Sequence, residues 1–196
     1  MTSAPTADET RVRILKEAER LFRHYGYSKT TVADIADACA MSSANVYRFF
    51  PSKSAIVEAI CGVIISELER QLREIAIADA PASQRLAQFI ELIARHTVET
   101  YTEDRKVHEM VVVAMEEHWG AIDRHLQATE AMIASIVASG IEAGEFKRQD
   151  PAQAAKCVHF AVAGFSHPVV TAQCCSNPDT PSPSEMAAFI LSALNA

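Results

Sequence analysis

Apolar positions recur with helical spacing along nearly the whole chain. The pattern predicts helices at about 9–27, 32–39, 43–50, 52–78, 83–102, 106–117, 119–143, 151–167 and 184–195. Residues 1–8 are predicted to be a disordered leader, because they are polar and lack the apolar core of a signal peptide. No stretch alternates between apolar and polar residues as a half-buried strand does. The fold class is therefore predicted to be all-α.

Two of the predicted helices are short and are separated by a tight turn. The first has an apolar stripe at i, i+3, i+4 and i+7, formed by Val32, Ile35, Ala36 and Cys39. In the second, Val46 and Phe50 share the inner face. So few apolar anchors make this helix dependent on its neighbours and leave its outer face free. The helix at 9–27 is predicted to support both, through Ile14, Ala18, Leu21, Phe22 and Tyr25.

The outer face of the second short helix carries side chains that suit a nucleic acid. Asn45 and Arg48 point away from the core, and these residue types read adenine and guanine by paired hydrogen bonds. Tyr47 can donate to a phosphate. Lys53 stands at the next helix N-terminus, where its charge and free backbone N–H groups can meet a second phosphate. Each residue alone could equally be an ordinary solvated one, but their spacing together favours DNA binding.

The segment from Thr30 to Lys53 resembles the DNA-binding signature of the TetR family of bacterial transcriptional regulators. The resemblance covers roughly the first sixty residues. It implies a three-helix helix-turn-helix domain at 9–54, joined by a long helix to a helical ligand-binding and dimerisation domain at 55–196. The base-reading positions that it implies are Ala44, Asn45 and Arg48. The phosphate-contacting positions that it implies are Thr31, Ser42, Ser43, Tyr47 and Lys53.

Two positions depart from the pattern of that family. The turn between the short helices usually holds glycine, but here it holds Ala40, where a left-handed backbone is strained. The position before the final aromatic residue often holds His or Tyr, which can contact a phosphate, but here it is Phe49. We therefore expect a strained turn and one phosphate contact fewer.

The net charge of −7 is distributed unevenly along the 196 residues. Residues 1–60 carry 8 basic and 7 acidic side chains, which gives +1, whereas the remainder carries 10 and 18, which gives −8. Only the N-terminal end is thus expected to face nucleic acid. No run of about 18 apolar residues is present, so we expect no membrane span and a cytoplasmic protein.

The resemblance also implies roles for the C-terminal helices. The family binds an inducer between helices of this domain, and the candidate lining residues are Phe89, Ile93, His96, Met110, Trp119, Met132 and Phe165. Each could instead be ordinary core. The last two helices form the homodimer in the family, and the candidate interface residues are Phe160, Ala161, Phe165, Met186, Phe189, Ile190, Ala193 and Leu194. A monomer core is the alternative for this second set.

The sequence offers little for catalysis. It has no HExxH, no zinc-ligand spacing, no Gly-rich phosphate loop and no GxSxG, so we expect no enzyme, no cofactor and no metal. Residues Glu116–His118, Asp123 and His125 could contribute ligands, but such residues are usually solvated. Cys39, Cys61 and Cys157 lie on apolar stripes and are predicted to be core residues. The pair Cys174 and Cys175 leaves a redox-sensing variant open.

These observations together predict a dimeric, sequence-specific DNA-binding regulator. We expect it to repress transcription at a palindromic operator and to be released by a small, largely apolar effector. The alternatives are a dimeric module that binds DNA or protein away from promoters, an enzyme that uses the C-terminal cavity, and the redox-sensing variant.

Overall fold

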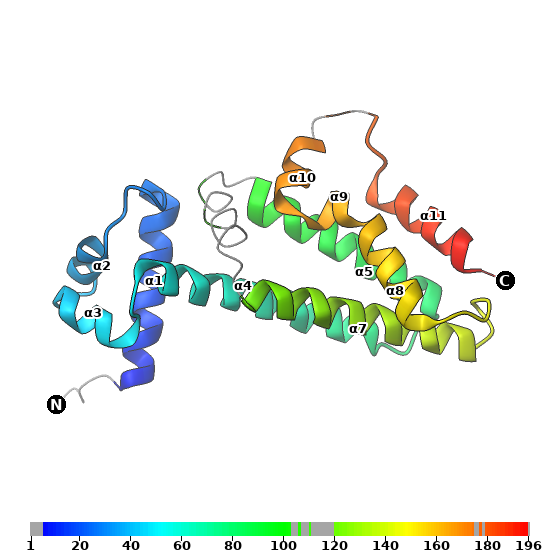
Figure 1. Cartoon of the computed structure of the whole chain (residues 1–196), viewed down its shortest axis with the longest axis horizontal. Helices are drawn as coiled ribbons and strands as arrows, with labels where there is room; N and C mark the ends of the chain where they lie inside the picture. Colours follow the sequence, from blue (N-terminus) through cyan, green and yellow to red (C-terminus); the bar gives the residue numbers. More distant parts are fainter. Residues whose placement is uncertain are drawn as a thin grey trace. The chain divides into compact units, whose positions relative to one another are not determined.

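The computed structural model describes residues 6–102, 106, 110, 120–174, 177 and 179–195, and within them the regular elements are helices (Figure 1). The all-α prediction is therefore confirmed. The helices are α1 (Ala7–Tyr25), α2 (Val32–Ala38), α3 (Ser43–Phe49), α4 (Lys53–Ala76), α5 (Ala82–Thr97), the π-helix η1 (Val98–Thr102), α7 (Gly120–Glu142), α8 (Pro151–Ala161), α9 (Ala163–Ser166), α10 (Pro168–Cys174) and α11 (Pro183–Leu194). Apart from Met110 and Lys106, the predicted helix at 106–117 lies outside the described residues.

The chain forms two compact units. The N-terminal unit contains residues 6–64 with Lys106 and Met110, and the C-terminal unit contains residues 65–102 with the described residues from 120 onward. The division falls at residue 64 within α4, later than the predicted boundary at residue 54. Each unit has its own buried apolar side chains.

Helix α1 begins earlier than the sequence pattern predicts. Thr6 is its N-cap, with Thr6 Oγ1 accepting from the backbone N–H of Glu9 at 3.2 Å and the Glu9 carboxylate accepting from the Thr6 N–H at 2.7 Å. Residues 7 and 8, predicted to belong to the leader, lie in α1. Gly26 ends the helix at φ 90°. Tyr25 is 55% exposed, so its assignment to the buried face was wrong, and Thr10 is buried instead.

The core of the C-terminal unit is built from α4, α5, α7, α8 and α11. Helix α5 lies against α7 and α11, and α7 lies against α8. The central side chains are Leu86, Phe89, Ile90, Ile133, Ile136, Val137, Val158 and Ile190. Phe89 and Ile136 are completely buried.

The region after α8 differs from its prediction. The helix predicted at 151–167 is interrupted at buried Val162, after which α9 and α10 follow. The face of α8 that packs inward consists of Ala154, Ala155 and Val158. Cys157, predicted to be a core residue, is exposed, and so is Phe160. This helix is apolar on more than one face, so periodicity alone did not identify the buried face.

Glu145, in the turn after α7, caps the start of α5. Its carboxylate accepts from the backbone N–H groups of Ala82 at 2.8 Å and Ser83 at 3.0 Å, and from Ser83 Oγ at 2.7 Å. The bond from the Ser83 backbone is the main reason why the pKa of Glu145 is lowered. A distant carboxylate thus does the work of an N-cap residue.

Replacing Glu145 with alanine is expected to lower the free energy of unfolding by about 1–2 kcal/mol at neutral pH. Because the pKa of Glu145 is depressed in the folded state, its contribution is present above the ordinary glutamate pKa of about 4.3 and is lost as the pH falls through the folded-state pKa. Urea unfolding at pH 7 and in acid should show the difference between wild type and Glu145→Ala shrinking. Glu142→Ala, at an exposed site nearby, should show no such change.

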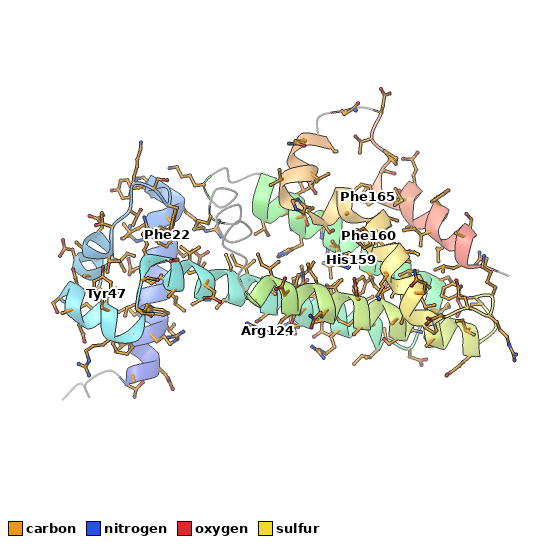
Figure 2. The ribbon with its side chains drawn as sticks, in the orientation of Figure 1. Phe22, Tyr47, Arg124, His159, Phe160 and Phe165 are labelled. Carbon is orange, nitrogen blue, oxygen red and sulfur yellow. The ribbon has the colours of Figure 1, made fainter. Side chains whose placement is uncertain are left out.

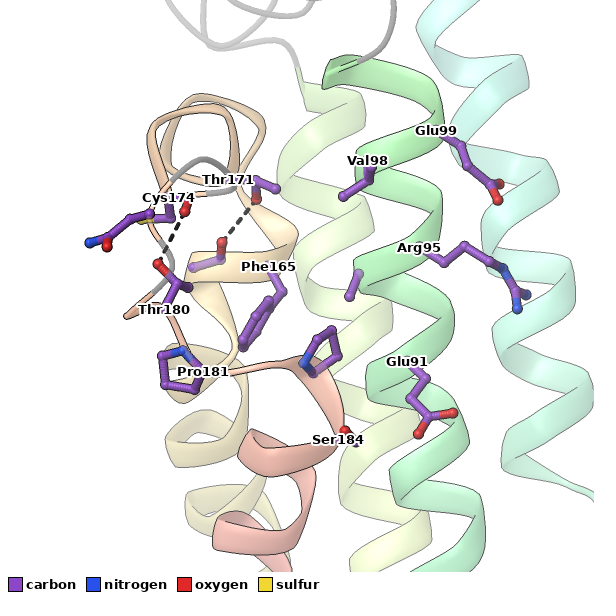
Figure 3. A pocket seen from close by; sticks show the side chains of 14 residues that line it. Glu91, Arg95, Val98, Glu99, Phe165, Thr171, Cys174, Thr180, Pro181 and Ser184 are labelled. Atoms are coloured by element: carbon purple, nitrogen blue, oxygen red, sulfur yellow. Dashed lines mark hydrogen bonds between the residues drawn. The ribbon is translucent and has the colours of Figure 1, made fainter.

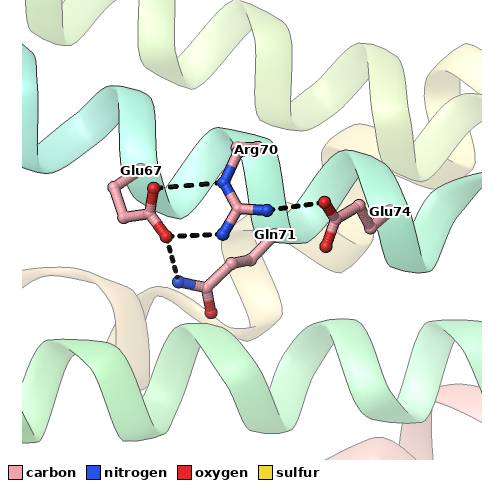
Figure 4. Close-up of polar contacts among 4 residues, drawn as sticks. All are labelled: Glu67, Arg70, Gln71 and Glu74. Carbon is pink, nitrogen blue, oxygen red and sulfur yellow. Dashed lines mark hydrogen bonds and ion pairs between the residues drawn. The ribbon is translucent and has the colours of Figure 1, made fainter.

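The part of α4 in the C-terminal unit carries an exposed polar cluster (Figure 4). Arg70 donates to Glu67 through Nε at 3.1 Å and Nη2 at 2.7 Å, and to Glu74 through Nη1 at 2.6 Å. The Arg70 and Gln71 bonds lower the pKa of Glu67 to about 2. Such exposed pairs stabilise a helix only slightly.

Among the described helices, none alone is long and apolar enough to cross a membrane. Helices α3 and α4 reach that length and composition only as a pair with a bend of 51° between them.

Candidate nucleic-acid interface

A hydroxyl side chain caps the N-terminus of each of the two short helices. Thr31 caps α2, and its Oγ1 accepts from the Asp34 N–H at 3.2 Å while donating to the Asp34 carboxylate at 2.7 Å. Ser42 caps α3, and its Oγ accepts from the Asn45 N–H at 3.3 Å. These caps pair backbone donors that would otherwise be open at the helix starts. They fix where α2 and α3 begin.

The predicted inner faces of the two helices are confirmed. The buried side chains on α2, on α3 and at their ends are Val32, Ile35, Ala36, Cys39, Val46 and Phe50. Arg11 from α1 covers this layer, with its guanidinium 4.2 Å from the Phe50 ring centroid and its Nη1 donating to the Phe49 carbonyl at 3.2 Å. Burial raises the pKa of the Cys39 thiol, and it raises that of the Cys61 thiol on α4 to about 11. Both cysteines are core residues, as predicted.

The outer face of α3 is open to solvent. Ala44, Tyr47 and Arg48 are exposed, and Tyr47 stands on this helix at 50% exposure (Figure 2). Asn45 is half-buried, and its Nδ2 lies 3.6 Å from Met41 Sδ. Thr31 and Ser42 are exposed, whereas Ser43 is half-buried. The structure thus brings the predicted base-reading and phosphate positions together on α2, α3 and their caps.

Lys53 has partners inside the domain that its sequence position does not reveal. Its Nζ donates to the carbonyls of Tyr27 at 2.9 Å and Thr30 at 3.1 Å, and it lies 4.0 Å from the Tyr27 ring centroid. Burial lowers the pKa of this ammonium group. The lysine therefore ties the first turn of α4 to the connection between α1 and α2. Nothing in the spacing signals this contact, because the partners are 23 and 26 residues away in the sequence.

The turn between α2 and α3 has the left-handed residue that the sequence analysis anticipated. Ala40 has φ 52°, and it is the sole non-glycine with positive φ in the described chain. Its N–H donates to the Asp37 carbonyl at 3.0 Å, and the Met41 N–H donates to the Ala36 carbonyl at 2.9 Å. This bond pattern is a helix stop that normally has glycine at the position of Ala40.

Ala40→Gly is expected to raise the free energy of unfolding by about 0.5–1 kcal/mol. Glycine removes a left-handed penalty of about 1–2 kcal/mol, and its greater freedom in the unfolded chain offsets part of that gain. Denaturant unfolding measures the difference. Ala33→Gly, at an exposed site inside α2, should have the opposite sign because its backbone is helical. A destabilised Ala40→Gly would contradict the strain at this turn.

The predicted effector-pocket residues that the structure describes lie in different surroundings. Phe89, Ile93 and Met132 are at most 9% exposed and belong to the core of the C-terminal unit. His96 is half-buried, with burial lowering its pKa and Nε2 lying 3.5 Å from Thr100 Oγ1. Met110 belongs to the N-terminal unit, and Trp119 lies outside the described residues.

Phe165, the remaining candidate, lines a cavity of about 670 Å³ (Figure 3). The cavity lies between α5 with η1 on one side and α9, α10 and the segment leading into α11 on the other. Cys174 also lines it, whereas Cys175 lies outside the described residues. Phe165 is on α9, beyond the interruption that the sequence pattern did not predict.

Two aromatic side chains are exposed on α8 and α11. Phe160 is 78% exposed and Phe189 is 68% exposed (Figure 2 shows Phe160). Ala161 and Ala193 are exposed as well, Met186 and Phe165 are half-buried, and Ile190 and Leu194 are buried within the chain. The predicted interface set is therefore divided between an outer surface and the core. Phe160 and Phe189 thus leave aromatic surface uncovered within the single chain.

The arrangement of α1, α2 and α3 defines a helix-turn-helix DNA-binding protein. Comparison with known proteins agrees along most of the chain. Residues 14–60 match the model of bacterial regulatory proteins of the tetR family, and residues 82–184 match the tetracyclin repressor-like C-terminal domain. The protein belongs to the tetR family and is a transcriptional regulator.

Individual relatives agree with this assignment. The chain is 27% identical to the HTH-type transcriptional repressor KstR2 of Rhodococcus jostii over 154 residues, which are 73% of this chain and 74% of that protein. A transcriptional regulator from Cytophaga hutchinsonii has the same fold, with a TM-score of 0.68 at 22% identity over 93% of this chain and 97% of that one. FadR from Bacillus subtilis, solved with stearoyl-CoA, has a TM-score of 0.62 at 18% identity over 94% and 97%.

Proposed function

We propose that this protein represses transcription by binding a palindromic operator as a homodimer, and that a small, largely apolar effector releases it. The observation that carries the proposal is the outer face of α3, which is solvent-exposed on a helix that is capped and anchored from beneath. That KstR2 is a repressor supports the direction of regulation.

In the proposed complex, α3 enters the major groove of DNA. Arg48 reads guanine and Asn45 reads adenine, each by paired hydrogen bonds, while Ala44 leaves room for close approach. The hydroxyl and phenol groups of Ser42, Ser43 and Tyr47 donate to the flanking phosphates. Thr31 joins them when its hydroxyl hydrogen turns from the Asp34 carboxylate to a phosphate. Lys53 has three N–H donors, of which the carbonyls of Tyr27 and Thr30 use two, so a phosphate can take the third.

The homodimer is proposed to form through α8 and α11. Phe160 and Phe189 are largely exposed in the single chain, and burying aromatic residues of this size stabilises an interface. A helix-turn-helix dimer places its two recognition helices in half-sites about 34 Å apart, which matches a palindromic operator. The interface therefore governs DNA binding as well as assembly.

Release by an effector requires that the ligand bind the DNA-incompetent state more tightly. The difference in binding free energy is typically about 1–3 kcal/mol. A cavity in the C-terminal unit supports a ligand site in this domain.

The proposal is tested first by fluorescence anisotropy with the duplex that flanks the protein's own gene, in excess nonspecific DNA. We expect binding that resists the competitor. Arg48→Ala should lower affinity for this duplex about 10–100-fold with little effect on nonspecific DNA. Tyr47→Phe should weaken binding to both DNAs, because only a phosphate contact is lost.

Binding that the competitor abolishes, followed by a genome-wide map without discrete promoter sites, would reject the repressor and favour a DNA-binding module that acts away from promoters. Equal losses in Arg48→Ala on specific and nonspecific DNA would remove Arg48 from base reading.

A further inference from the structure

The cavity beside Phe165 has a lining that is apolar at its centre and carries hydroxyl groups. Phe165, Val98 and Pro181 are among its apolar residues, and the hydroxyls come from Thr171, Thr180 and Ser184. The volume of about 670 Å³ lies within the range of small-molecule sites. The direction in which these hydroxyl hydrogens point decides what the cavity can recognise.

Two of the hydroxyl hydrogens are used within the protein (Figure 3). Thr171 Oγ1 donates to the Gly164 carbonyl at 3.0 Å, and Thr180 Oγ1 donates to the Cys174 carbonyl at 3.0 Å. A carbonyl can only accept, so the threonine must be the donor in each bond. With its hydrogen used, each oxygen can take part in a further hydrogen bond only as an acceptor.

The third hydroxyl is committed through a short chain of bonds. Ser182 Oγ donates to the Glu185 carboxylate at 2.7 Å, so its single hydrogen is used. Ser184 Oγ lies 3.1 Å from Ser182 Oγ. Because Ser182 has no second hydrogen to give, Ser184 donates to it. A further partner of any of the three lining hydroxyls must therefore donate to its oxygen.

The charged residues of the lining also bear on which ligands the cavity can bind. Glu91, Arg95 and Glu99 line the cavity, and their charged ends point away from Phe165 and Thr180 (Figure 3). Two carboxylates against one guanidinium leave a net negative charge at this edge. Arg95 is the one cation among these lining residues and it points away, so an anionic ligand beside Phe165 would lose hydration without gaining an ion pair. Asn177 carries amide N–H groups and is an exposed residue of the lining.

We propose that this cavity is the effector site and that it takes a largely apolar molecule with a hydroxyl or N–H donor and no anionic group. The proposal rests on the proposed release by a ligand, and it specifies the chemistry of that ligand. The ligand donates to the threonine and serine oxygens while its apolar body packs on Phe165, Val98 and Pro181. Carboxylates and phosphates are excluded.

Three matched probes test the chemistry: para-propylphenol, its methyl ether and para-propylbenzoate. They share an apolar body and differ in carrying a donor, no donor or a negative charge. Isothermal titration of the full chain should show saturable binding of the phenol, binding of the ether about tenfold weaker or less, and no saturable binding of the benzoate. Equal binding of phenol and ether, preference for the benzoate, or no binding of any probe would overturn the proposal.

Variants locate the binding. Gly164 lines the cavity and a Cβ there would meet no atom within 4 Å, so Gly164→Leu adds a side chain at the lining without a clash at Cβ, and it should abolish phenol binding. Gly62→Leu is the matched control, because its Cβ also meets nothing within 4 Å and Gly62 lies outside the cavity lining. Undiminished binding by Gly164→Leu would place the ligand elsewhere and overturn the assignment.

Thr180→Val separates recognition from structure. It removes one acceptor, and it also removes the bond to the Cys174 carbonyl. If the hydroxyl recognises the donor, phenol affinity falls about tenfold while affinity for the ether, which shares the shape but gives no hydrogen, stays the same. An equal loss for both probes would mean that Thr180 is only structural.

The same preparations distinguish failure of this inference from failure of the proposed function. If the protein binds the operator but not the phenol, the proposed ligand chemistry is wrong and the proposal of a repressor stands. If Gly164→Leu abolishes phenol binding but the phenol does not release the operator duplex, the ligand site is correctly located. The proposed release from DNA by a ligand is then wrong.

Discussion

Phe160→Glu is expected to convert the proposed dimer into monomers and to lower operator affinity by about a hundredfold or more. Phe160 is 78% exposed on α8, so the change is tolerated in the single chain. In a two-fold interface the substitution buries two carboxylates without partners. A monomer then engages one half-site and loses the gain from simultaneous binding of two, which is about 100–10,000-fold. Sedimentation and anisotropy measure the two effects.

Phe189→Glu on α11 should behave in the same way, because Phe189 is 68% exposed. The matched control is Ile77→Glu, an equally drastic change at a residue that is 76% exposed just after α4. It should leave both assembly and DNA binding unchanged. If Phe160→Glu and Phe189→Glu both remain dimeric, α8 and α11 do not form the interface.

Lys53→Met should have two separable consequences. Losing the bonds to the Tyr27 and Thr30 carbonyls and the contact with the Tyr27 ring is expected to lower the free energy of unfolding by about 2–3 kcal/mol. If the third N–H meets a phosphate, the slope of log affinity against log salt falls by about one unit as well. Chemical unfolding and anisotropy at several salt concentrations measure these quantities independently.

Lys29→Met provides the comparison, because Lys29 is an exposed lysine in the same unit. It should leave stability nearly unchanged. A Lys53→Met protein of lowered stability but unaltered salt slope would confine Lys53 to its role inside the domain. Unaltered stability would instead show that the contacts of Lys53 with Tyr27 and Thr30 do not stabilise the folded protein.

Some features of the helix-turn-helix depend only on residues that are close together in the sequence. Examples are the caps at Thr31 and Ser42 and the inner face of α2. Each depends on residues within one or two helical turns, so it can be predicted from the sequence. The strain at Ala40 was foreseeable for the same reason, since a helix stop is a local bond pattern.

Other features join residues that periodicity treats as unrelated. Glu145 caps α5 from 62 and 63 residues away, and Lys53 reaches back to the turn after α1. The cavity required the interruption at Val162, which places Phe165 on a separate short helix. The spacing of apolar residues within a helix does not predict contacts between residues that are far apart in the sequence.

By itself the sequence determined the all-helical class, the two capped short helices with their inner and outer faces, and the resemblance that pointed to DNA. These properties follow from 3.6-residue periodicity and from hydrogen bonds between near neighbours. Only the tertiary structure decided which apolar face of α8 is buried, which candidate residue meets a cavity, and how Lys53 is used. Those outcomes depend on which helices pack together, and a helix that is apolar on several faces leaves that choice to its neighbours.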